Sequence, residues 1–195
     1  RFRPYGDFGQ GQFPSTEESA TSEFSNVVIY LESASLSREP TAQGTPHRIA
    51  QRGERFEPHV LVVTRDSRVE FPNDDNIFHN VFSLSGPAAF DLGRYPKDDS
   101  RSVVFTESGV VRVFCQIHSD MSALVVVLDH GYFAVPDAEG DFSIEGIPPG
   151  EYTLVSWHER IRPVRQPVRI LAGQATSLSV HLPILDDDGS DADRR

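Results

Sequence analysis

Short runs of apolar and β-branched residues, bounded by Gly, Pro, Asp and Asn, recur along most of the chain. Runs of this length and composition are typical of β-strands, and their spacing is typical of β-sandwiches. No stretch shows the 3.6-residue apolar repeat of an amphipathic helix, and only residues 87–95 are a candidate for a turn or a short helix. The pattern therefore predicts an all-β protein. The predicted strands are NVVIYL (26–31), HVLVVT (59–64), RVEF (69–72), NVFSL (80–84), SVVFT (102–106), VVRVFC (110–115), ALVVVL (123–128), GYFAV (131–135), DFSIEGI (141–147), EYTLVSW (151–157), PVRIL (167–171) and SLSVHL (177–182).

One predicted strand, ALVVVL, is apolar at every position, whereas a strand with one face in water alternates. We therefore expect a second β unit to cover its outer face. The two ends of the chain are polar and lack periodicity, which is typical of disorder. The predicted segments are a flexible arm at 1–24, a strand and connector at 25–49, a first β domain at 50–128, a second β-sandwich at 129–183 and an acidic disordered tail at 184–195.

Charge and cysteine content narrow the function classes. The formal net charge is −11, from 18 Lys and Arg against 29 Asp and Glu, so nucleic acid is not the expected partner. The locally basic segment 160–169 fits either a solvated face or the docking of an acidic partner. A single cysteine excludes an internal disulfide, and no apolar run approaches the roughly 20 residues of a membrane-spanning helix.

The candidate chemistry lies in the stretch VFCQIHSDM. It contains the only cysteine (Cys115) and the only methionine (Met121), with His118 between them in the spacing C-x2-H-x2-M. Two imidazoles and a thiolate in a trigonal plane, with a weak thioether on the axis, form a blue-copper electron-transfer site. An earlier strand supplies a second histidine, His79. The alternatives are a buried structural thiol at Cys115 and a core methionine at Met121.

These stretches also resemble a known family. "HNVF" and "VFCQIHSDM" resemble the cupredoxins, in particular the plastocyanin and amicyanin group, over residues 50–128, and the short ligand loop is similar to that of amicyanin. The resemblance implies a Greek-key β-sandwich with one type 1 copper ion per chain. Its ligands would be His79, Cys115, His118 and Met121, with His118 nearest the surface. It also implies that Asn80 ties the two ligand loops together and donates a hydrogen bond toward the cysteine sulfur.

A second resemblance covers the following domain. "DFSIEGIPPGEYTLVSWHE" resembles the carboxypeptidase regulatory-like domain, a small sandwich of transthyretin type. The combination is similar to bacterial proteins labelled as methylamine-utilisation proteins. "NVVIYLES" looks like an early strand of this second sandwich although it precedes the first domain. The cupredoxin domain would then be inserted into the second one, unless residues 26–33 pair only within the cupredoxin sheet.

From these features we expect a type 1 copper protein that passes single electrons between redox partner proteins through transient contacts. The alternative is copper storage, sensing or delivery without electron-carrier turnover. Enzymatic activity is not expected, because the chain lacks the His-x-His pairs of multicopper enzymes, and His158 lacks the second histidine of a zinc-protease motif. Copper chemistry implies an exported, periplasmic protein, with any signal peptide removed. Asp120 either faces solvent or influences the copper site.

Overall fold

The computed structural model describes residues 23–33, 36 and 47–183. Most of the predicted N-terminal arm and all of the predicted acidic tail therefore lie outside the described residues. Strands dominate the described part, which confirms the predicted all-β class. The elements are the 3₁₀ turn η1 (Glu23–Asn26) and the strands β1 (Val28–Glu32), β2 (His47–Arg48), β3 (Ala50–Arg52), β4 (Arg55–Glu57), β5 (Val60–Thr64), β6 (Ser67–Pro72), β7 (His79–Ser85), β8 (Ala88–Tyr95), β9 (Ser100–Phe105), β10 (Gly109–Phe114), β11 (Ser122–Leu128), β12 (Phe133–Ala134), β13 (Gly150–Trp157) and β14 (Val164–Ile170).

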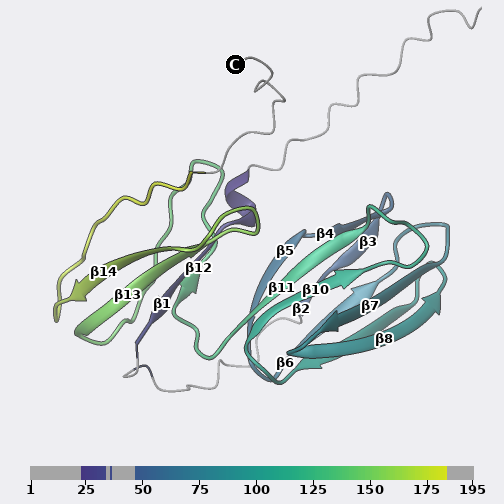
Figure 1. The fold of residues 1–195 in the computed structure, drawn as a ribbon, viewed down its shortest axis with the longest axis horizontal. Coiled ribbons are helices and arrows are strands. Elements are labelled where there is room, and N and C mark those ends of the chain that lie inside the picture. The colour runs from purple at the N-terminus through teal and green to yellow at the C-terminus, as the bar shows by residue number, and fades with distance from the viewer. Residues whose placement is uncertain (1–22, 34–35, 37–46, 184–195) are drawn as a thin grey trace, which may run out of the picture.

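Strands β2 to β11 form the larger body in Figure 1. A five-stranded sheet in the order β5-β11-β10-β7-β8 packs against a three-stranded sheet in the order β2-β6-β9. The fully buried side chains between them include Val111 and Val125 from the first sheet and Phe71 and Phe105 from the second. Burial of these apolar faces against each other is the main stabilising contribution to a β-sandwich. The hairpin β3–β4 forms a separate two-stranded sheet.

The remaining strands form a four-stranded sheet, β12-β1-β13-β14, beside the larger body (Figure 1). Strand β1 precedes the larger body in the chain, yet it pairs with β12 and β13, which follow that body. This pairing is the one that the insertion hypothesis requires. The chain thus begins one sheet, builds the sandwich of β2 to β11, and returns to complete the first sheet.

The outer face of β11 is covered, as its sequence predicts. Leu124, Val126 and Leu128 project from β11 into a cluster with Val28 of β1, and Phe133 and Trp157 of the four-stranded sheet pack against it. Since β11 is buried on both faces, its uniformly apolar sequence is explained by contact with both sheets. Trp157 therefore lies in the contact between the two parts, whereas Tyr152 lies in the core on the opposite side of the four-stranded sheet.

Three predictions about local structure are wrong. Residues 87–95 form no helix, because Ala88–Tyr95 is the strand β8 paired with β7. Residues 141–147 and 177–182 form no strands. Their alternating apolar side chains, including Phe142, Ile144 and Val180, pack on the four-stranded sheet, so the alternation reflects burial of one face without a backbone partner.

Among the described residues, no helix is long and apolar enough to cross a membrane.

Candidate metal centre

Strand pairing brings the predicted site residues together from two stretches of chain. His79 is the first residue of β7, and Cys115 directly follows β10. The loop from residue 115 to 121 joins β10 to β11 and is closed by the pairing of those strands. Two backbone hydrogen bonds tighten it: Cys115 N–H donates to the Met121 carbonyl (3.1 Å), and Met121 N–H donates to the His118 carbonyl (3.2 Å). The loop is therefore a constrained turn rather than a free connection.

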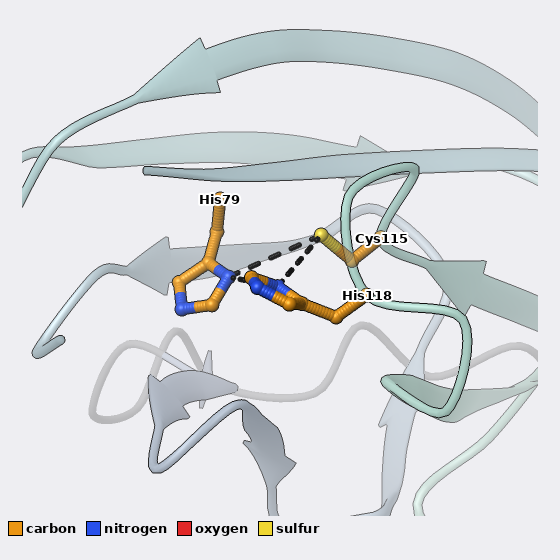
Figure 2. Close-up of side chains that lie close together, drawn as sticks. All are labelled: His79, Cys115 and His118. Carbon is orange, nitrogen blue, oxygen red and sulfur yellow. Dashed lines mark hydrogen bonds between the residues drawn. The ribbon is translucent and has the colours of Figure 1, made fainter. Parts of the chain in front are cut away.

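Three side chains converge from these elements, as Figure 2 shows. The Nδ1 atoms of His79 and His118 lie 3.1 Å apart, and Cys115 Sγ lies 4.0 Å and 3.9 Å from them, respectively. The three form a group with the spacing of metal ligands. The point equidistant from the three atoms lies about 2.1 Å from each, close to the ~2.0–2.3 Å of metal–nitrogen and metal–sulfur bonds. The geometry therefore suits one small cation with two imidazole ligands and one thiolate.

The two imidazoles differ in exposure. His79 is fully buried and Cys115 is 5% exposed, whereas the His118 side chain is 23% exposed. Of the two histidines, His118 is thus nearer the surface, as the sequence resemblance implies. The residues that precede the histidines, Phe78 and Ile117, are exposed apolar side chains. The site consequently opens to solvent through one imidazole edge with apolar neighbours in the chain.

Met121 lies at the end of the same loop with its side chain 1% exposed. It belongs to the buried apolar cluster that also contains Cys115. Burial of a thioether in this cluster fits both of its predicted roles, packing and axial ligation, because methionine is apolar and its sulfur is a soft donor. Asp120, beside it in the chain, is exposed and accepts a hydrogen bond from the Ser119 hydroxyl (3.3 Å).

Asn80 joins the two ligand stretches, but in a different way from the expected one. Its side-chain oxygen accepts a hydrogen bond from the backbone N–H of Gln116 (3.3 Å), the residue after Cys115. Its amide nitrogen donates to Asp91 Oδ1 (2.8 Å) in β8 rather than toward the cysteine sulfur. Asn80 is 1% exposed, so these bonds fix a buried polar group and the start of the ligand loop together.

Two carboxylates that sequence reasoning missed lie behind the imidazoles. Asp75 Oδ2 is 2.8 Å from His79 Nε2, and Glu54 Oε2 is 3.6 Å from His118 Nε2. Asp75 also accepts the backbone N–H of Gly53 (2.7 Å, Oδ1) and of Glu54 (2.9 Å, Oδ2). Burial alone would raise the pKa of Asp75, but these two N–H groups and the imidazole of His79 together lower that pKa below its usual value.

Two other buried or half-buried histidines lie outside this group. His59 directly precedes β5, and its ring nitrogens contact the Ser122 carbonyl (3.1 Å) at the start of β11 and Glu159 Oε1 (2.6 Å), which follows β13. His158 is 1% exposed, and its Nδ1 accepts the backbone N–H of Arg160 (3.3 Å). Burial lowers the pKa of His158, and the Arg160 charge lowers it further against the opposing effect of Glu23.

Known proteins resemble this chain in structure but not in sequence family. No protein-family model and no curated protein matches the chain. Similar solved structures include a purple cupredoxin from Nitrosopumilus maritimus, with 24% identity, a TM-score of 0.38 and coverage of 42% of this chain and 98% of that one. A point mutant of amicyanin in its Cu(I) form has 24% identity, a TM-score of 0.41 and coverage of 51% and 97%. A copper-containing nitrite reductase from Thermus scotoductus has 23% identity, a TM-score of 0.41 and coverage of 50% and 25%.

Proposed function

We propose that this protein is a type 1 copper protein that carries single electrons between redox partners. The observation that carries the proposal is the convergence of His79 Nδ1, His118 Nδ1 and Cys115 Sγ, within 3.1 to 4.0 Å of one another, at the rim of a β-sandwich. Two imidazoles and one thiolate match the equatorial ligands of blue copper. When bound, one copper ion would supply a one-electron couple.

The ligand residues have distinct roles in this proposal. Cys115 binds through its thiolate, and its burial keeps water away from the sulfur. His79 is held rigidly in the interior, whereas His118 presents one imidazole edge to solvent and forms the electron port. Met121, buried in the same cluster as Cys115, would supply a thioether as a weak further ligand. The pairing of β10 with β11 holds the loop at both ends. The loop residues therefore keep nearly the same positions when the charge at the site changes.

The exposed apolar side chains of Ile77, Phe78 and Ile117 precede the two histidines in the chain and support a small contact with a redox partner. Small contacts of this kind dissociate quickly, as electron carriers require. We also propose that residues 50–128 form a cupredoxin domain and that residues 129–183, together with β1, form a second domain of transthyretin type. An exported location follows from the proposed copper chemistry.

Copper titration tests the proposal. We expect purified protein to bind one Cu(II) per chain and to show an intense visible sulfur-to-copper charge-transfer band, because the thiolate mixes strongly with copper. Cys115→Ser should remove the band, whereas Ser119→Ala, on the same loop, should keep it. A folded wild-type protein that binds copper without this band would contradict the proposal. Slow, incomplete reoxidation of the Cu(I) form would instead favour copper storage or delivery over electron transfer.

A further inference from the structure

The carboxylate of Asp75 is placed to control both imidazoles of the proposed copper site. Both carboxylate oxygens of Asp75 have hydrogen-bond partners. Oδ1 accepts the backbone N–H of Gly53 (2.7 Å), and Oδ2 accepts the backbone N–H of Glu54 (2.9 Å) and lies 2.8 Å from His79 Nε2. A carboxylate accepts hydrogen bonds and does not donate them. His79 Nε2 therefore carries a hydrogen and donates it to Asp75.

This hydrogen bond decides which ring nitrogen of His79 has a free lone pair. With the hydrogen on Nε2, the lone pair is on Nδ1, the nitrogen that lies 4.0 Å from Cys115 Sγ and 3.1 Å from His118 Nδ1. The opposite tautomer would direct an N–H at the site and could not bind a metal. Partners of this kind also orient a metal-ligating ring and raise the basicity of its ligand nitrogen.

Asp75 also acts on the second imidazole through the turn between β3 and β4. Gly53 and Glu54 form the tip of this hairpin, and both adopt positive φ angles of about 60° (59° and 60°). The left-handed conformation is unfavourable for glutamate, so other contacts must hold it. The two hydrogen bonds from the tip to Asp75 hold the turn, and the turn carries the Glu54 carboxylate to within 3.6 Å of His118 Nε2.

We propose that Asp75 is a positioning residue with two roles. It fixes the tautomer of His79, and through the β3–β4 turn it places the Glu54 carboxylate near His118 Nε2. Each of the two imidazoles then has a carboxylate beside its Nε2 atom. The inference rests on the proposed copper function for its effect on the redox couple. Carboxylate backing makes an imidazole a stronger donor and favours Cu(II) over Cu(I). The reduction potential of the site is therefore lower than it would be without the two carboxylates.

Asp75→Asn is the variant that tests this role. An asparagine has one acceptor and one donor at its tip, so at least one of the three N–H groups around position 75 would face an N–H instead of an oxygen. Asp74→Asn is the matched control. It removes the same charge from the neighbouring residue, which pairs with Arg48 and Arg52 and contacts neither histidine in the described structure.

The first measurement needs no copper. In ¹⁵N NMR spectra of the histidine side chains of the metal-free protein, wild type and Asp74→Asn should show His79 protonated at Nε2 only. Asp75→Asn should populate the Nδ1–H form. Wild-type protein with its hydrogen on Nδ1 would overturn the proposal even if Asp75→Asn does not fold. This readout stands whether or not the copper proposal is correct.

The second measurement uses the copper-loaded protein. Loss of a partner of this kind changes metal affinity roughly 10–100-fold. Asp75→Asn should therefore weaken Cu(II) binding relative to Cu(I) by tenfold or more beyond Asp74→Asn, and each tenfold change raises a one-electron potential by about 59 mV. Glu54→Gln should shift the potential in the same direction by less, because its carboxylate is more distant. Equal potentials in Asp75→Asn and Asp74→Asn would overturn the proposal, while the visible band still reports separately on the copper site.

Discussion

Leu124→Ala tests whether the four-stranded sheet really shields the outer face of β11. Leu124 is 2% exposed and belongs to the cluster that joins β11 to β1, with Trp157 packed against it. Deleting most of a buried leucine side chain removes its transfer free energy and leaves a cavity, at a cost of about 2–5 kcal/mol. For a chain of this size, 1 kcal/mol lowers the melting temperature by roughly 2–4 °C. We therefore expect a loss of several degrees or more.

Leu84→Ala is the matched control. Leu84 also lies in a strand of the larger body, but its side chain is 82% exposed. A surface substitution of this kind changes stability by about 0.5 kcal/mol or less. Because both variants replace leucine by alanine in a strand, differences in strand propensity largely cancel. Urea unfolding followed by circular dichroism measures both free energies of unfolding, and equal small losses would show that Leu124 is not covered.

Two further predictions concern the site and the pH dependence of stability. Met121→Leu should leave the band from Cys115 in place and raise the reduction potential, by about 59 mV for each tenfold loss of Cu(II) affinity relative to Cu(I); an unchanged potential would argue against axial ligation. Burial, with Arg160 adding to it, lowers the pKa of His158 below the ordinary histidine value of 6.5, so below pH 6.5 the unfolded chain binds more protons than the folded one. The free energy of unfolding should therefore fall as the pH decreases from 6.5 toward the folded-state pKa, and His158→Gln should reduce this slope; an equal slope in both proteins would refute a neutral, buried His158.

Local patterns alone suggested a shared role for three residues of the β10–β11 loop, because these residues are close in the chain. Cys115, His118 and Met121 lie within one short connection between two strands, so their spacing alone suggests a shared target. His79 was selected only as a histidine on an earlier strand, and the family resemblance then matched it to the loop, because the residues around His79 do not indicate which distant loop it contacts. The structure brings His79 to that loop through the pairing of β7 with β10.

The carboxylates behind the imidazoles could not be predicted in this way. The contact of Asp75 with Gly53 and Glu54 joins residues more than 20 positions apart, and the β3–β4 hairpin is absent from the predicted strands. Glu54 in a left-handed turn also contradicts local preference. Such contacts depend on tertiary packing, which overrides the local signal.

The second sheet shows the limit of periodicity in another form. The apolar sequence of β11 correctly indicated that another unit covers its outer face, because a strand buried on both faces has apolar residues at every position. The alternation in residues 141–147 and 177–182 predicted strands where the structure has none. Alternating apolar and polar residues indicate which face of a segment is buried. A strand also requires a neighbouring backbone paired in register.

Copper-edge anomalous diffraction from crystals of the copper-loaded protein shows directly whether His79, Cys115 and His118 bind one copper ion. We expect one anomalous peak, within bonding distance of His79 Nδ1, His118 Nδ1 and Cys115 Sγ. A fully loaded crystal with its copper peak elsewhere, or with the ring of His79 turned away from the ion, would contradict this expectation.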